Sequence, residues 1–80
     1  MNAIIKALSE QAAKAMKDGE IFQVNSSAFD SEADVRRFIT HTTNLLGANI
    51  RAHAHAGMLT VYLDDGSPVG NSVTVATVER

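Results

Sequence analysis

The sequence predicts an α+β fold, a two-layer sandwich with two helices on one face of a small mixed sheet. Two segments repeat apolar residues at helical spacing, and three others alternate like strands, in the order α-β-α-β-β. A β-branched segment near the end adds a C-terminal strand. Each element buries one face, so packing both helices on one side of the sheet is the natural arrangement. Eighty residues, 45% of them apolar, suit one domain spanning residues 1–80.

The first helix is predicted over residues 1–17, with Asn2 as a candidate N-cap and Gly19 just beyond its end. Its apolar residues fall on one face, which predicts the side that packs on the sheet. These residues are Ile4, Ile5, Leu8, Ala12, Ala15 and Met16.

The second helix is predicted over residues 31–46 and ends at Gly47. Ser31 can accept a hydrogen bond from the Asp34 amide, and Asp34 can return one in a variant of the capping box. Phe29 and Val35 flank this cap nearly at the spacing of a hydrophobic staple. The expected buried stripe consists of Val35, Phe38, Ile39, Thr42 and Leu45.

Strands are predicted over residues 20–26, 50–55, 59–63 and 72–78. In the first, Phe22 and Val24 point to one face, and Ile21, Gln23 and Asn25 to the other. The Ala56-Gly57 pair between the second and third strands predicts a tight hairpin turn. Residues 64–67 predict another turn, and residues 68–71 a loop.

Composition excludes several function classes. The chain has no cysteine, which removes disulfides, thiolate metal sites and cysteine nucleophiles. Its net charge of −2 comes from interspersed acids and bases, so no basic footprint for nucleic acid is present. The N-terminus does not read as a signal peptide, and no apolar run suits a bilayer. We expect a cytoplasmic protein without a membrane or nucleic-acid partner.

The most informative side chains alternate along the second strand. Arg51, His53 and His55 share one face, while Ala52 and Ala54 share the other. The small alanines fit under the helices, which turns the other three side chains to the open face of the sheet. Ile21 is expected to join them there as an exposed apolar residue. The predicted binding residues on that face are Arg51, His53, His55, Thr60, Tyr62 and Gln23.

Other chemistries are less well supported by the residues present. Two histidines could face one metal ion, but zinc needs three or four protein ligands, and His41 is expected behind the sheet. Asp64 and Asp65 fit the turn better than a role beside a catalytic histidine. We therefore expect no enzyme, no metal site and no cofactor. Arg36 and Arg37 on the second helix are a lesser candidate surface for an acidic partner.

Several segments together carry a family resemblance over residues 3–63. They are the helix leading into Gly19-Glu20, the Asp34-Val35-x-x-Phe38 helix with Leu45-Leu46-Gly47, and the hairpin ending in Leu59-Thr60-Val61-Tyr62-Leu63. In this order they resemble the TusA-like sulfur-carrier family. The resemblance implies the fold, but the family's Cys-x-Pro motif and first strand have no counterpart in this chain. It therefore implies no sulfur transfer.

The missing first strand would leave the strand at residues 21–24 with an open edge. Val73, Thr74, Val75 and Thr77 could fill it, either within the chain or from a second copy in a homodimer.

We expect a non-catalytic module that binds a protein partner through its open sheet face. By compositional analogy it could be a small phage-type inhibitor or adaptor. One alternative is a cysteine-less relative of a sulfur-relay carrier that retains a docking role. Another is a weak metal- or RNA-binding module using His53, His55 and Tyr62.

Overall fold

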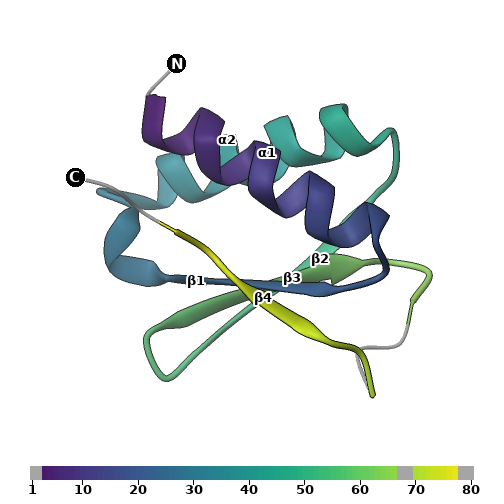
Figure 1. Cartoon of the computed structure of the whole chain (residues 1–80). Coiled ribbons are helices and arrows are strands. Elements are labelled where there is room, and N and C mark those ends of the chain that lie inside the picture. The colour runs from purple at the N-terminus through teal and green to yellow at the C-terminus, as the bar shows by residue number, and fades with distance from the viewer. Residues whose placement is uncertain (1–2, 67–69, 78–80) are drawn as a thin grey trace.

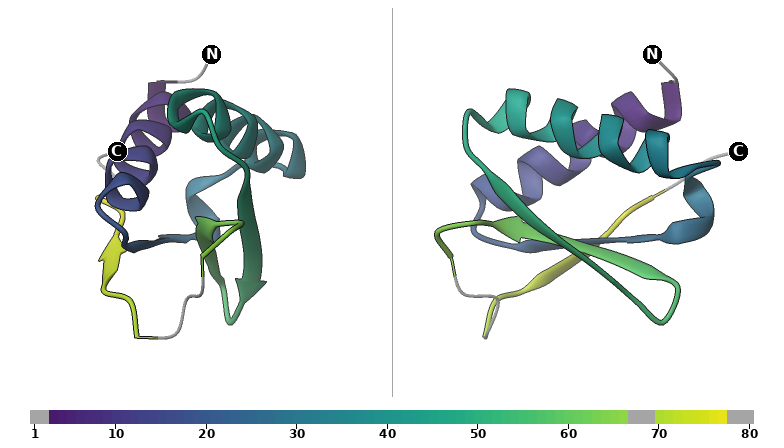
Figure 2. Two further views of the ribbon diagram at one scale, coloured as in Figure 1. Left: turned by 90° about the vertical axis from the view of Figure 1, so that its right-hand side faces the viewer. Right: turned by 180° about the vertical axis from the view of Figure 1, so that it is seen from behind.

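The computed structural model describes residues 3–66 and 70–77, and it confirms the α+β class. Two helices lie side by side on one face of a four-stranded mixed sheet with the order β2-β3-β1-β4 (Figures 1 and 2). The elements are α1 (Ala3–Lys17), β1 (Ile21–Asn25), the 3-10 helix η1 (Ser26–Ala28), α2 (Glu32–Leu46), β2 (Ile50–His55), β3 (Met58–Leu63) and β4 (Val73–Val75). Within the described residues, neither helix is long and apolar enough to cross a membrane.

Helix α1 packs through a face of apolar and small residues. Of the six residues predicted to line it, five are buried and Ile4 is partly buried. Ser9, which the apolar pattern leaves out, is also fully buried. Its hydroxyl donates to the carbonyl oxygens of Ile5, at 2.8 Å, and Phe38, at 3.4 Å. The second bond reaches the backbone of α2, so a small side chain lets the two helices approach closely. The predicted cap at Asn2 lies outside the described residues.

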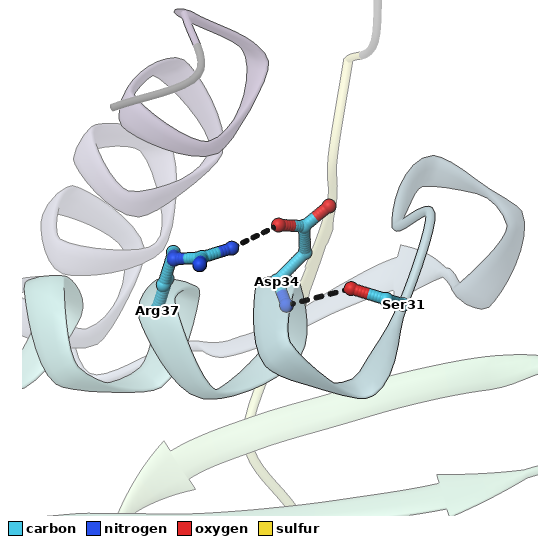
Figure 3. A network of polar contacts seen from close by, with 3 residues as sticks. All are labelled: Ser31, Asp34 and Arg37. Carbon is cyan, nitrogen blue, oxygen red and sulfur yellow. Dashed lines mark hydrogen bonds and ion pairs between the residues drawn. The ribbon is translucent and has the colours of Figure 1, made fainter.

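Helix α2 begins at the predicted cap. The Ser31 hydroxyl accepts a hydrogen bond from the Asp34 amide at 3.3 Å (Figure 3). The predicted return bond from Asp34 is wrong, because its carboxylate instead accepts from Arg37 at 2.8 Å. Arg37 lies three residues further along the helix, a spacing at which side chains are neighbours.

The buried stripe of α2 differs from the prediction at its C-terminal end. Phe38 and Thr42 are buried, whereas Leu45 is 40% exposed and Leu46 packs against the core. Leu46 continues the four-residue row of Phe38 and Thr42, and Leu45 is rotated away from Leu46 by about 100°. The prediction that Leu45 belongs to the buried stripe is therefore wrong, and the neighbouring Leu46 takes its place.

Strands β2 and β3 form the predicted hairpin. The turn residues Ala56 and Gly57 have φ angles of 52° and 78°, as in the two-residue turns that match strand twist. The register pairs Arg51 with Tyr62, Ala52 with Val61, and His53 with Thr60. Strand β1 pairs antiparallel with the other side of β3.

Strand β4 fills the edge beside β1 from within the same chain. It runs parallel to β1, with Ile21 opposite Val73 and Gln23 opposite Val75. It is shorter than the predicted strand over residues 72–78, of which Val78 lies outside the described residues. The turn is observed at residues 64–66, while the parts of the predicted turn and loop at 67–69 also lie outside them.

Two side-chain contacts fasten this C-terminal segment to the rest of the fold. The Gln11 amide donates to the Thr77 carbonyl and accepts from the Thr77 amide, both at 2.9 Å. The Thr74 hydroxyl donates to the Glu20 carboxylate. Together with pairing to β1, these contacts attach the segment to both layers.

Candidate binding surface

The open face is the side of the sheet that neither helix covers (Figure 2). Residues that pair across neighbouring strands point to the same side, so the register decides which side chains meet there. The open face comprises Arg51, His53 and His55 of β2; Met58, Thr60 and Tyr62 of β3; Ile21, Gln23 and Asn25 of β1; and Val73 and Val75 of β4. All six predicted binding residues lie on it.

Arg51 is held in place by an acidic neighbour. Its Nε donates to a carboxylate oxygen of Asp64, just beyond the end of β3, at 2.5 Å. The two side chains remain 60% and 48% exposed. An exposed pair of this kind contributes only about 0–1 kcal/mol to stability, so its main effect is to orient the guanidinium.

His53 and Tyr62 form a fixed pair beside Arg51. Their rings are nearly parallel, with centroids 5.8 Å apart and planes 20° from each other. The His53 Nε2 and the Tyr62 hydroxyl are 3.0 Å apart, within hydrogen-bond distance. The histidine is exposed and the tyrosine half-buried. The pair therefore presents an aromatic ring with a polar end on the face of the sheet that the helices leave uncovered.

The remaining predicted residues extend this cluster in two directions. Gln23 donates from its amide to the Thr60 hydroxyl at 3.4 Å, at the centre of the open face. His55 is exposed at the hairpin end of β2, opposite Met58.

Ile21 does not behave as predicted. It lies on the open face but is only 6% exposed, so the expected exposed isoleucine is absent. Ile21 is in the central strand β1, opposite Val73, and extending the β1–β3 register places it opposite Tyr62. Large side chains on both neighbouring strands therefore cover it.

Strand β4 adds two residues that the sequence did not assign to this surface. Val73 and Val75 are 47% and 61% exposed on the open face. Their alternation around Thr74 was visible in the sequence, but the face depends on the pairing with β1. The open face thus has hydrogen-bond donors along β2 and apolar side chains along β4.

The two alanines of β2 lie on the helix side, but only one is covered. Ala52 packs partly against the core, whereas Ala54 is exposed. The prediction that both alanines pack beneath the helices is therefore wrong for Ala54. It instead borders a groove of about 310 Å³ between β2 and the first turns of α2.

The other candidate residues lie on the outer side of α2. Arg36, Arg37 and His41 line one shallow hollow there, and Arg37 is oriented by Asp34 (Figure 3). His41 is thus separated by the sheet from His53 and His55, as expected. Across residues 3–66 and 70–77, no three side chains of the types His, Asp and Glu are grouped to hold a metal ion.

Comparison of the chain with protein-family models, curated proteins and solved structures gives no match.

Proposed function

We propose that the chain is a non-catalytic module that binds a protein partner through its open face. The observation that supports this most directly is the fixed display of Arg51, His53 and Tyr62 on an uncovered sheet. Arginine and tyrosine are enriched among residues that dominate binding energy. Side chains already held in one orientation lose less conformational entropy when a partner binds.

The composition of the open face also supports a protein partner. Exposed Val73 and Val75 provide apolar contact area, and Gln23 and Thr60 provide polar groups between the two edges. Protein interfaces are enriched in aromatic residues and arginine, and they combine apolar contact area with about one hydrogen bond per 100–200 Å².

Arg51→Ala and Tyr62→Ala test this proposal. Each variant should weaken partner binding by about 1–2 kcal/mol or more if the residue is a hot spot. For Arg51→Ala, stability should change by only about 0.5–1 kcal/mol, because that side chain is exposed. Tyr62→Ala should cost more than Arg51→Ala, because Tyr62 is half-buried opposite the buried Ile21. Binding proteins are first captured from a cell lysate. The affinity of a captured protein is then measured for each variant, and a thermal melt checks that each variant folds.

Arg37→Ala is the matched control on the opposite layer. It removes the same charge from the outer side of α2, and it should leave binding unchanged. If both open-face variants fold and bind like the parent while Arg37→Ala binds weakly, the α2 surface is the binding site and the proposal is wrong.

The identity of the captured protein distinguishes between two more specific functions, an inhibitor and a sulfur-relay relative. A regulatory or enzymatic host target, inhibited by the chain, would support the phage-type inhibitor. A sulfur-transfer enzyme would support a cysteine-less relative of a sulfur-relay carrier.

A further inference from the structure

Strand β2 ends the sheet, and no described residue pairs with the backbone groups on its outer edge. The Asp64 amide donates to the Asn49 carbonyl at 3.1 Å, so Asn49 and Asp64 form a hydrogen-bonded pair next to the first pair of the hairpin, Ile50 and Leu63. Hydrogen-bonded and non-bonded positions alternate along an antiparallel pair. Backbone groups of Arg51, His53 and His55 therefore turn toward β3, and those of Ile50, Ala52 and Ala54 turn away from the sheet.

Apart from the charge of Arg51, this edge lacks the features that usually prevent strand addition. Such features include charged side chains, proline, bulges and very short edge strands. Strand β2 has six regularly paired residues with no proline or lysine, whereas β4 at the opposite edge has only three. An extended chain is the natural occupant, because the backbone of another strand matches this row of alternating donors and acceptors.

The groove beside Ala54 offers a place for side chains of an added strand. Ala54, Leu59, Phe29 and Val35 form its apolar part, and Ser26, Glu32 and Arg36 also line it. Every second side chain of an added strand would point to this helix side. Apolar side chains at those positions would cover Phe29 and Val35, which the fold leaves partly exposed.

The alternate positions of an added strand would lie on the open face beside Arg51, His53 and His55. Guanidinium and imidazole N–H groups suit carboxylates, so acidic side chains fit there. A second copy of β2 fits poorly. Two-fold pairing through the outward positions would place Arg51, His53 and His55 opposite the same three residues of the copy, and Asp64 of each chain pairs only with that chain's Arg51.

We propose that β2 binds an extended peptide segment as a fifth strand, with apolar residues toward α2 and acidic residues toward the open face. This site shares Arg51, His53 and His55 with the open face, but its contacts with the β2 backbone and with the groove on the helix side lie outside that face.

A synthetic peptide that alternates valine with glutamate tests the proposal on the full chain. Binding should slow hydrogen exchange of the Ala52 and Ala54 amides by about 10-fold or more, because both gain backbone acceptors. A valine–lysine peptide should bind more weakly, since it places cations beside Arg51. A valine–glutamate peptide with N-methylated backbone amides should also bind more weakly, since it cannot donate to β2.

Ala54→Asp is the protein variant to test, with Val75→Asp as the matched control on the other edge. Both positions are exposed, so thermal melts should stay close to that of the parent. The new carboxylate at Ala54 borders the apolar groove and should raise the peptide's Kd about 10-fold or more, while Val75→Asp should not.

Three results would overturn the proposal. They are no binding of the valine–glutamate peptide at millimolar concentration, equal affinity for the lysine peptide, and binding that leaves the Ala52 and Ala54 amides unprotected. If the valine–glutamate peptide does not bind while Arg51→Ala still weakens capture of a protein partner, the β2 proposal is wrong and the open-face proposal stands.

Discussion

Phe38 occupies the point where α1, α2 and the sheet meet. It is fully buried, and its ring lies 6.3 Å from that of Phe22 and 5.3 Å from that of Phe29. Phe38→Ala should therefore destabilise the fold by roughly 3–5 kcal/mol, because the cavity has aromatic neighbours on two sides. Denaturant unfolding measures this loss. Phe29→Ala is the control, since Phe29 is only partly buried and should cost less.

At the residue scale, the sequence identified groups whose surroundings follow from local spacing. The Ser31 cap and the shared face of Arg51 and His53 are examples, because both depend only on neighbours along the chain. Ser9 could not be identified as a core residue, since a serine inside a helix reads as polar. Its burial depends on the carbonyl oxygen of Phe38, which is 29 positions away in the sequence.

At the element scale, the hairpin turn is constrained by its backbone, because it holds a residue other than glycine at positive φ. Ala56 has a φ of 52°, in the left-handed region that residues other than glycine, asparagine and aspartate rarely adopt. Asparagine followed by glycine is the preferred pair in this turn. Ala56→Asn should therefore stabilise the fold by about 0.5–1 kcal/mol, seen as a higher denaturant midpoint.

Gly57→Ala is the converse test of the same turn. Gly57 has a φ of 78° and open space where a Cβ would stand, so any loss of stability reflects backbone conformation rather than a clash. A more stable Gly57→Ala variant would contradict this account of the turn.

At the element scale, the order of helices and strands was predictable, and their exact faces were less so. Helical and strand periods are local properties, so α2 and β3 were located to within a residue. The exposure of Leu45 and the burial of Ile21 depend on packing partners contributed by other elements. The groove at Ala54 likewise depends on how far α2 covers β2, which no local pattern states.

At the scale of the whole molecule, the C-terminal segment converts β1 from an edge strand into a central one. The β-branched composition predicted a strand, and the open edge at residues 21–24 predicted its place. The parallel register with Ile21 opposite Val73 was not predictable, because the segment 64–72 between the strands fixes no register by turn geometry. That register determines which valines join the open face.

Deleting the chain after Gly70 should lower the thermal midpoint or cause precipitation. The truncation removes the β4 pairing and the contacts of Thr74 with Glu20 and of Thr77 with Gln11. Backbone groups of β1 that bond Ser72 and Ala76 would then form a bare edge, which favours aggregation. Each kcal/mol lost should lower the midpoint by about 4–8 °C in a domain of this size.

Gln11→Ala and Gln11→Glu test how much of the stability lost on truncation comes from the contact between Gln11 and Thr77. Alanine removes both hydrogen bonds to Thr77, whereas glutamate keeps an acceptor for the Thr77 amide and turns a carboxylate toward the Thr77 carbonyl. Both variants should melt between the full chain and the truncation, because pairing of β4 with β1 remains. If the truncated chain is as stable and soluble as the full chain, β4 contributes nothing to the fold and β1 needs no neighbour on that side.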